Sequence, residues 1–168
     1  MRDRIWNNLS SIKFQSKYLD KISRKSHNFG NIYSFFLAFT TASSVATWAI
    51  WEKSPLIWAT IVGISQILQI GKPYIPFIKN EREFIEMSLL FESLYLSYEK
   101  LWFDNEKLEK NEQIIEEQFY ELRRKELDVN TQFKHIVCPE FKKLINEVNI
   151  ETDNFLKTNF TVGDNHAR

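Results

Sequence analysis

The chain has 168 residues, with 22 Lys and Arg against 22 Asp and Glu, so its formal net charge is zero. That length predicts one structural unit, and the neutral charge argues against a general nucleic-acid binder. The single cysteine, Cys138, excludes an internal disulfide framework. With only four Gly and four Pro, long helices are favoured over strands. We expect an all-α protein whose soluble part lies in a reducing compartment.

Residues 1–28 predict a basic amphipathic helix. Two interpretations of its basic side stay open, because it can lie against anionic lipid headgroups or pack on the C-terminal helices. Asn28, Gly30 and Asn31 predict a loosened joint after it rather than one unbroken helix. The apolar side carries Ile5, Leu9, Ile12, Leu19 and Ile22, and the basic residues are Arg2, Arg4, Lys13, Lys17, Lys21, Arg24 and Lys25.

Two apolar runs follow, Phe29–Trp51 and Ser54–Gly71, neither with an ionisable side chain. Only Glu52 and Lys53 separate them, so the runs must be antiparallel. As helices they reach about 35 Å and about 27 Å, close to the roughly 30 Å hydrocarbon layer of a bilayer. We predict a transmembrane helical hairpin over residues 29–71.

The two spans are expected at about 30–51 and 55–71, with two kinds of face. Small residues every four positions let two backbones approach closely in lipid; these helix-packing candidates are Ala38, Ala42, Ala46, Ala59 and Gly63. Polar side chains at membrane depth need partners or water. They are candidates for lining a pore or, alternatively, for hydrogen bonding between helices: Thr40, Ser44, Thr47, Gln66 and Gln69.

The flanks of the hairpin predict its orientation. Basic residues precede it, and Lys72, Lys79 and Arg82 follow it, so the positive-inside rule places both termini in the cytoplasm. A bacterial inner (cell) membrane is the expected location. The alternatives are a buried helix pair of a soluble protein and a signal peptide cleaved after Ala46, which the late start of the apolar run and the second run disfavour.

Residues 72–162 predict a cytosolic helical domain, followed by a disordered tail at 163–168. Apolar residues recur in steps of three and four from Phe84 to Ile136, a coiled-coil-like pattern whose wide early stripe suits a bundle. Whether residues 79–136 form one long helix or a hairpin turning at Asp104–Asn105 stays open. Pro139 is expected to start a last helix. The repeating positions are Phe84, Met87, Phe91, Leu94, Tyr98, Leu101, Asn105, Leu108, Glu112, Ile115, Phe119, Leu122, Glu126, Val129, Phe133 and Ile136.

Catalytic and metal chemistry is not expected. The four glycines form no phosphate loop, and His135 with Cys138 supplies only two ligands, too few for a structural zinc site. We predict no enzyme activity and no cofactor. The compact basic patch Arg123, Arg124 and Lys125 is either a solvated face or a site for an anionic ligand or acidic partner, because Arg suits bidentate contacts.

The basic helix Lys13–Lys25, the closely coupled spans and the aromatic-rich helix beginning Phe84–Met87 together resemble the SLATT family, small two-span effectors of bacterial conflict systems. The resemblance covers most of the chain and is architectural, without a catalytic motif. It implies a membrane-disrupting or pore-forming effector of antiphage defence, activated by a nucleotide second messenger, such as a cyclic nucleotide, or by a cytosolic partner protein.

The leading hypothesis is therefore a homo-oligomeric membrane effector that is gated through its cytosolic helices. A non-toxic membrane scaffold that recruits a partner through its helical domain is the second hypothesis, and a phage holin-like protein is the third. The lipid bilayer is the expected partner in each case, and nucleic acid is not.

Overall fold

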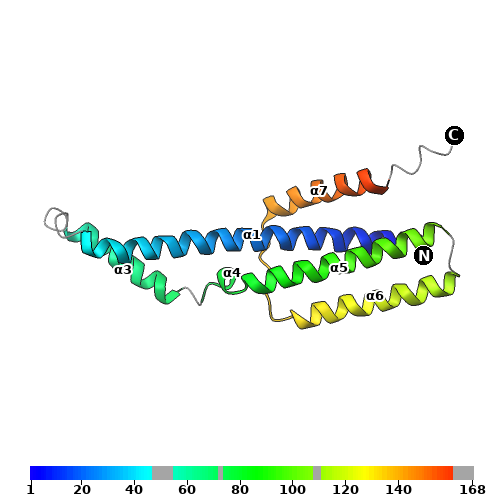
Figure 1. Cartoon of the computed structure of the whole chain (residues 1–168), viewed down its shortest axis with the longest axis horizontal. Coiled ribbons are helices and arrows are strands. Elements are labelled where there is room, and N and C mark those ends of the chain that lie inside the picture. The colour runs from blue at the N-terminus through cyan, green and yellow to red at the C-terminus, as the bar shows by residue number, and fades with distance from the viewer. Residues whose placement is uncertain (47–54, 72–73, 108–110, 161–168) are drawn as a thin grey trace. The chain divides into compact units, whose positions relative to one another are not determined.

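The computed structural model describes residues 1–46, 55–71, 74–107 and 111–160 (Figure 1). All secondary-structure elements of these residues are helices, which confirms the all-α class. The expected tail and the tip at 52–53 lie outside the described residues. The helices are α1 (Arg2–Ala46), α3 (Pro55–Gly71), α4 (Pro76–Lys79), α5 (Glu81–Glu106), α6 (Glu112–Gln132) and α7 (Lys142–Phe160).

The chain forms two compact units. We call residues 1–22 with 83–168 the bundle unit and residues 23–82 the hairpin unit. The expected divisions lay at 28/29 and 71/72. The hairpin unit is larger because residues around Ser26 pack on the segment after α3, where the Ser26 hydroxyl donates to the carbonyl of Phe77.

Helix α1 is unbroken from Arg2 to Ala46, so the predicted joint at Asn28–Asn31 is wrong. The side chains there are used in contacts: Asn31 hydrogen-bonds the ring of His27, one turn away, at 2.9 Å. A Cβ on Gly30 would lie 3.7 Å from the side chain of Ile78 of α4, an ordinary contact distance. Asn31 therefore bonds within the helix, and neither it nor Gly30 ends the helix.

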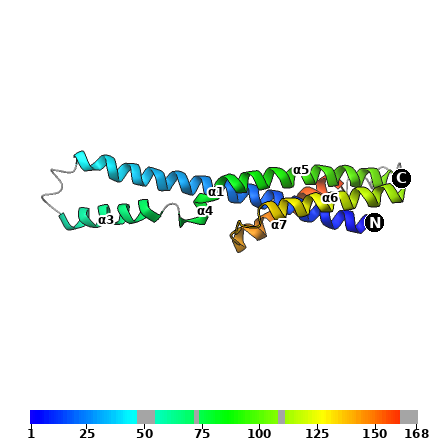
Figure 2. The same cartoon turned by 90° about the horizontal axis from the view of Figure 1, so that it is seen from below.

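Helices α5 and α6 form an antiparallel pair and lie side by side in both views (Figures 1 and 2). Gln132, at the end of α6, hydrogen-bonds Glu86, near the start of α5, at 3.1 Å. Tyr98 and Phe119 meet edge to face, with ring centroids 6.2 Å apart. The segment 79–136 is thus a hairpin, and not one long helix.

The hairpin does not turn at Asp104–Asn105, because α5 continues to Glu106. Helix α6 begins after Asn111, whose side chain accepts a hydrogen bond from the backbone N–H of Gln113 at 3.3 Å, an N-cap. Helix α7 begins at Lys142, three residues after the predicted start.

The core of the bundle unit follows the predicted repeat. Met87, Asn105, Glu126 and Ile136 are only half-buried and Glu112 is exposed, which places them at the edges and ends of the seam, while Leu108 lies outside the described residues. Burial of the remaining positions excludes water from the helix contacts, the main favourable term in folding. The buried positions are Phe84, Phe91, Leu94, Tyr98, Leu101, Ile115, Phe119, Leu122, Val129 and Phe133.

The first 22 residues of α1 lie among α5, α6 and α7. Ile5, Leu9 and Ile12 are at most 1% exposed, and Trp6 contacts Trp102 of α5 with centroids 5.0 Å apart. Packing on the C-terminal helices, one of the two open interpretations of this segment, is therefore what the structure shows.

In the hairpin unit, the described part of α3 runs from Pro55 to Gly71. Residues 23–46 of α1 contact the segment from 55 to 82. The Tyr33 hydroxyl donates to the carbonyl of Leu68, and the rings of Phe29 and Phe77 lie 6.2 Å apart. These contacts hold α1 against the C-terminal end of α3 and against α4.

Across the residues that are described, no helix is both long enough and apolar enough to cross a membrane. Helix α3 has 17 residues, and so extends about 26 Å against a hydrocarbon layer of roughly 30 Å. The expected first span, 30–51, runs past the described part of α1 at Ala46. The transmembrane hairpin stays a prediction.

Candidate functional site

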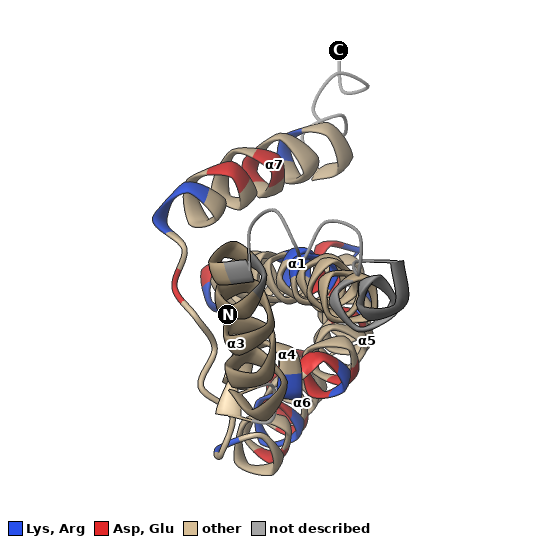
Figure 3. Ribbon diagram, turned by 90° about the vertical axis from the view of Figure 1, so that its left-hand side faces the viewer, with Lys and Arg blue, Asp and Glu red and all other residues tan. Residues whose placement is uncertain are grey.

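The hairpin unit presents large apolar side chains to its surroundings. Helix α3 carries neither an acidic nor a basic residue, as its uniform tan colour shows (Figure 3). Monomeric proteins in water rarely expose a contiguous apolar surface of this kind unless it meets a protein or a membrane. We call these side chains the exposed apolar face: Phe29, Ile32, Phe35, Phe36, Phe39, Leu56, Ile57, Val62, Ile64, Ile67 and Ile70.

Two of the five pore-lining candidates can be placed. Gln66 and Gln69 are both exposed on α3, so their amides are accessible from outside the single chain. Thr40 and Ser44 are helical residues of α1, but their side chains, like all of Thr47, lie outside the described residues. One polar group of α3 that was not a candidate, Ser65, is buried and donates to the carbonyl of Ile61 at 2.7 Å.

The helix-packing candidates whose side chains are described do not contact one another within one chain. Ala38 and Ala59 are exposed, and a Cβ on Gly63 would meet nothing within 4 Å. The side chains of Ala42 and Ala46 lie outside the described residues. The expected contact between two small faces is therefore not made by Ala38, Ala59 or Gly63 in a single copy.

Two residues of the basic patch, Arg123 and Lys125, form ion pairs within the chain. Arg123 donates to Glu126 at 2.7 Å and to Asn8 of α1 at 2.9 Å. Lys125 pairs with Glu121 at 2.8 Å, one helical turn away. Arg124 is exposed. Two of the three cations thus have carboxylate partners on their own helix, which favours the interpretation of a solvated face.

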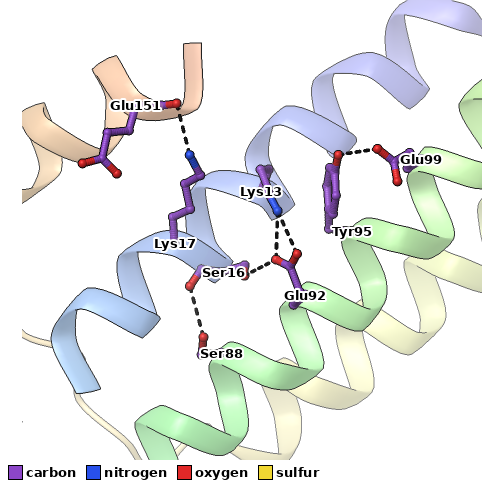
Figure 4. A network of polar contacts seen from close by, with 8 residues as sticks. All are labelled: Lys13, Ser16, Lys17, Ser88, Glu92, Tyr95, Glu99 and Glu151. Atoms are coloured by element: carbon purple, nitrogen blue, oxygen red, sulfur yellow. Dashed lines mark hydrogen bonds and ion pairs between the residues drawn. The ribbon is translucent and has the colours of Figure 1, made fainter. Parts of the chain in front are cut away.

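A polar network that the sequence analysis did not single out joins α1 to α5 inside the bundle unit (Figure 4). The Lys13 ammonium lies 2.8 Å and 3.1 Å from the two carboxylate oxygens of Glu92. Ser16 donates to the same carboxylate at 2.7 Å, and Ser88 donates to the carbonyl of Ser16 at 3.2 Å. The Lys13 ammonium also lies 4.0 Å from the ring centre of Tyr95, so a buried charge has both a counterion and an aromatic face.

The same side of α1 holds α7. We call Lys13, Lys17 and Lys21, spaced four residues apart, the lysine row. Lys17 donates to the backbone carbonyl of Glu151 at 3.1 Å (Figure 4). Lys21 pairs with Glu147 at 2.6 Å and also with Glu151. Lys13 and Lys21 therefore bind carboxylates of the protein itself, and Lys17 binds a backbone carbonyl.

The contacts of the network and of the lysine row shift the pKa values of their side chains. Burial disfavours the charged form of Glu92, but the hydrogen bonds from Lys13 and Ser16 and the positive charges of Lys13 and Lys17 outweigh it, and together they hold its pKa below the ordinary value. Burial lowers the pKa of Lys17, although Glu151 opposes this. Hydrogen bonds to Glu147 and Glu151 raise the pKa of Lys21. The Glu92 carboxylate is therefore charged at neutral pH.

The lowered pKa of Glu92 predicts a pH dependence. Its contribution to stability is full above the ordinary glutamate pKa of about 4.3 and is lost as the pH falls through the lower pKa of the folded state. A Glu92→Gln variant lacks that contribution at every pH. We expect the difference in Tm between parent and variant to shrink from about pH 6 to about pH 3, measured by circular dichroism. A difference that does not change with pH would contradict the assignment.

A groove of about 400 Å³ lies between α1 and α7 in the bundle unit. Its walls include Trp6 and Phe14 from α1 and Leu156 from α7. Two more lining residues, Ser10 and Thr152, have buried hydroxyl oxygens without a hydrogen-bond partner in the described structure. Buried polar atoms are normally paired, so these two hydroxyls are exceptions within the contact between α1 and α7.

Metal ligation has no support in the part of the chain that is described, since no three His, Cys, Asp or Glu residues gather there. His135 is exposed in a turn and Cys138 is half-buried in the segment between α6 and α7. Neither residue lies in a helix, because α6 ends at Gln132 and α7 begins at Lys142.

The sequence contained one weak indication of the contact between the lysine row and α7. The lysine row repeats at helical spacing on the side of α1 next to the apolar stripe, and the acidic residues Glu147 and Glu151 repeat at the same spacing on α7. Pairing the two rows requires knowing that α1 and α7 are neighbours. Glu92, 79 residues from Lys13, gave no signal of its own.

Comparisons with protein-family models, with curated proteins and with solved structures returned no match for this chain.

Proposed function

We propose that this protein is a membrane effector whose hairpin unit enters the bilayer and whose bundle unit controls it from the cytosol. The observation that carries the proposal is the exposed apolar face. Ile67 and Ile70 of α3 are 71% and 72% exposed, and Phe35 of α1 is 74% exposed. In water this surface is unfavourable, and a lipid environment removes that cost.

The length of α3 is compatible with insertion. A helix about 4 Å shorter than the hydrocarbon layer is accommodated by local thinning, at a fraction of a kcal/mol per Å. Its backbone hydrogen bonds are internal, as lipid requires. Gln66 and Gln69 remain the polar groups that need partners or water, which favours association of several copies around a polar path.

Permeabilisation is the activity proposed for this assembly. It rests on the resemblance to two-span effectors together with the exposed amides of α3. Both termini are cytoplasmic in this proposal, and the membrane is a bacterial inner membrane. Control belongs to the bundle unit, because a ligand or partner shifts a closed-to-open equilibrium only by binding the two states unequally.

The test replaces two exposed α3 residues, Ile64 and Ile67, with lysine. In a bilayer each buried lysine costs about 2.5–3.5 kcal/mol, so we expect the double variant to lose resistance to alkaline carbonate extraction and to stop depolarising cells in a membrane-potential dye assay. In water the same surface substitutions would be neutral.

Leu89→Lys is the matched control, because Leu89 is 66% exposed on α5 of the bundle unit. It should extract and depolarise like the parent. A parent protein that is recovered as a monodisperse species without detergent would refute the membrane proposal. A membrane-bound parent that never depolarises cells, under induction or phage challenge, would refute the effector activity alone.

A membrane scaffold is the second candidate, and one observation favours it. Tyr120 and Leu127, seven residues apart on one side of α6, are 45% and 63% exposed. Such a pair fits a partner helix. Membrane residence without depolarisation would move the assignment to the scaffold.

A further inference from the structure

Helix α7 is attached to the rest of the bundle unit by a segment without helical structure. Helix α6 ends at Gln132 and α7 begins at Lys142. Nine residues join them, enough to extend about 30 Å when straight. Tyr18 holds the base of α7, because its hydroxyl donates to the carbonyl of Pro139 at 2.6 Å and accepts from the N–H of Phe141 at 3.1 Å. At the other end of α7, the ring of Phe160 contacts the rings of Trp6, Trp102 and Phe103.

The contact between α1 and α7 specifies which helix fits there. Glu147, Glu151 and Phe155 recur every four residues on α7, and they meet the lysine row in antiparallel order. Lys21 pairs with both glutamates, and the Lys13 and Lys17 ammonium groups lie 4.7 Å and 5.0 Å from the ring centre of Phe155. The receptor surface on α1 thus selects an acidic helix with an aromatic residue one turn further on.

The polar part of this contact adds little stability. In its ion pairs the Lys21 side chain is 24% exposed and those of Glu147 and Glu151 are 53% and 43% exposed, and pairs this accessible to water contribute little to stability. The groove of about 400 Å³ and the unpartnered hydroxyls of Ser10 and Thr152 lie in the contact as well. The ion pairs therefore specify which helix binds here, whereas burial of Leu144, Val148 and Leu156 on α7 supplies stability.

We propose that the lysine-row surface of α1 is an interaction site for α7 of a second copy of this chain, so that two copies exchange their α7 helices. The charge pattern identifies the occupant, because α7 carries the acidic repeat that matches the row. Exchange preserves every α1–α7 contact and changes only the path of residues 133–141, which is why it is a low-cost route to a dimer. The proposal does not depend on membrane insertion.

The first test uses the unaltered full-length chain in mild detergent. Equal amounts of ¹⁵N-labelled and unlabelled protein are mixed, and a carbodiimide joins lysine ammonium groups to carboxylates that are in direct contact. Exchange predicts that a substantial share of the Lys21–Glu147 and Lys21–Glu151 cross-links joins one labelled to one unlabelled peptide. If all such cross-links lie within one isotopic species, exchange is excluded. Lys125–Glu121, paired within α6, should show no mixed product.

The second test uses charge reversal. One variant carries Lys17→Glu and Lys21→Glu, and the other carries Glu147→Lys and Glu151→Lys. Each alone places like charges across the contact, whereas a mixture restores opposite charges only between chains. We expect at least a tenfold enrichment of the mixed dimer over either homodimer, measured by copurification of differently tagged chains. A chain with all four changes restores the contact within itself and should behave as the parent does. Equal recovery of mixed dimer and homodimers would overturn the proposal, because dimerisation through another surface would not depend on this charge pattern.

Discussion

Replacing Phe91 with aspartate is expected to unfold the bundle unit. Phe91 is 1% exposed in the seam of α5. Removing the ring costs about 3–5 kcal/mol, and a carboxylate buried there without a partner costs several more or forces local opening. Together these losses match the whole stability of an ordinary domain, about 5–15 kcal/mol. Thermal unfolding followed by circular dichroism should show no cooperative transition for the variant.

Leu89→Asp is the matched control, since Leu89 lies on the same helix and is 66% exposed. A surface substitution of this kind changes stability by about 0.5 kcal/mol or less, so its transition should coincide with that of the parent. Equal destabilisation by the two substitutions would mean that the seam is not the core of this unit.

The second large effect is expected at the Lys13–Glu92 pair. The Lys13 side chain is 9% exposed and that of Glu92 is 41% exposed. Glu92→Leu removes the counterion of a buried ammonium, which costs about 3–5 kcal/mol for a fully buried pair. We expect about 2–3 kcal/mol here, because water reaches the glutamate side and screens the charge. Urea unfolding monitored by tryptophan fluorescence measures the loss.

The double variant Lys13→Met with Glu92→Leu should recover most of that stability, because no charge is then left without a partner. Glu121→Leu is the comparison for an exposed pair: both side chains of Lys125–Glu121 are more than half exposed, and little or no change in stability is expected. If the double variant is as unstable as Glu92→Leu, the loss does not come from the unpaired ammonium.

The helical class and the buried seam could be predicted from the sequence because both depend on local periodicity. Phe84, Phe91 and Tyr98 are buried at the positions that the repeat of three and four assigns to the core. The hairpin turn was placed too early, since Asp104 and Asn105 favour turns in isolation whereas the packing of α5 extends the helix through them.

Tertiary contacts explain what the sequence could not provide. Lys13 was assigned to a basic side that would lie against lipid headgroups or pack on the C-terminal helices. Lysine is almost never buried unless it is paired, and its partner Glu92 is recognisable only once α1 and α5 are adjacent. Gly30 was interpreted as a break, although α1 continues through it and packs on α4 there. The pore-lining and helix-packing candidates of the two spans were chosen for contacts with lipid, water or other copies of the chain. A single chain contains none of these.

The half-buried position of Cys138 has a chemical consequence. Burial, with a smaller effect of Glu140, raises the pKa of its thiol to about 11, so the thiolate is much rarer at neutral pH than for an ordinary cysteine. Oxidants and alkylating reagents attack the thiolate, and the native side chain is therefore slow to react while Tyr18 holds the adjoining Pro139. The chain thus contains its own reporter: an increase in the alkylation rate of Cys138 signals that the base of α7 has come loose, in unmodified protein and without an added label.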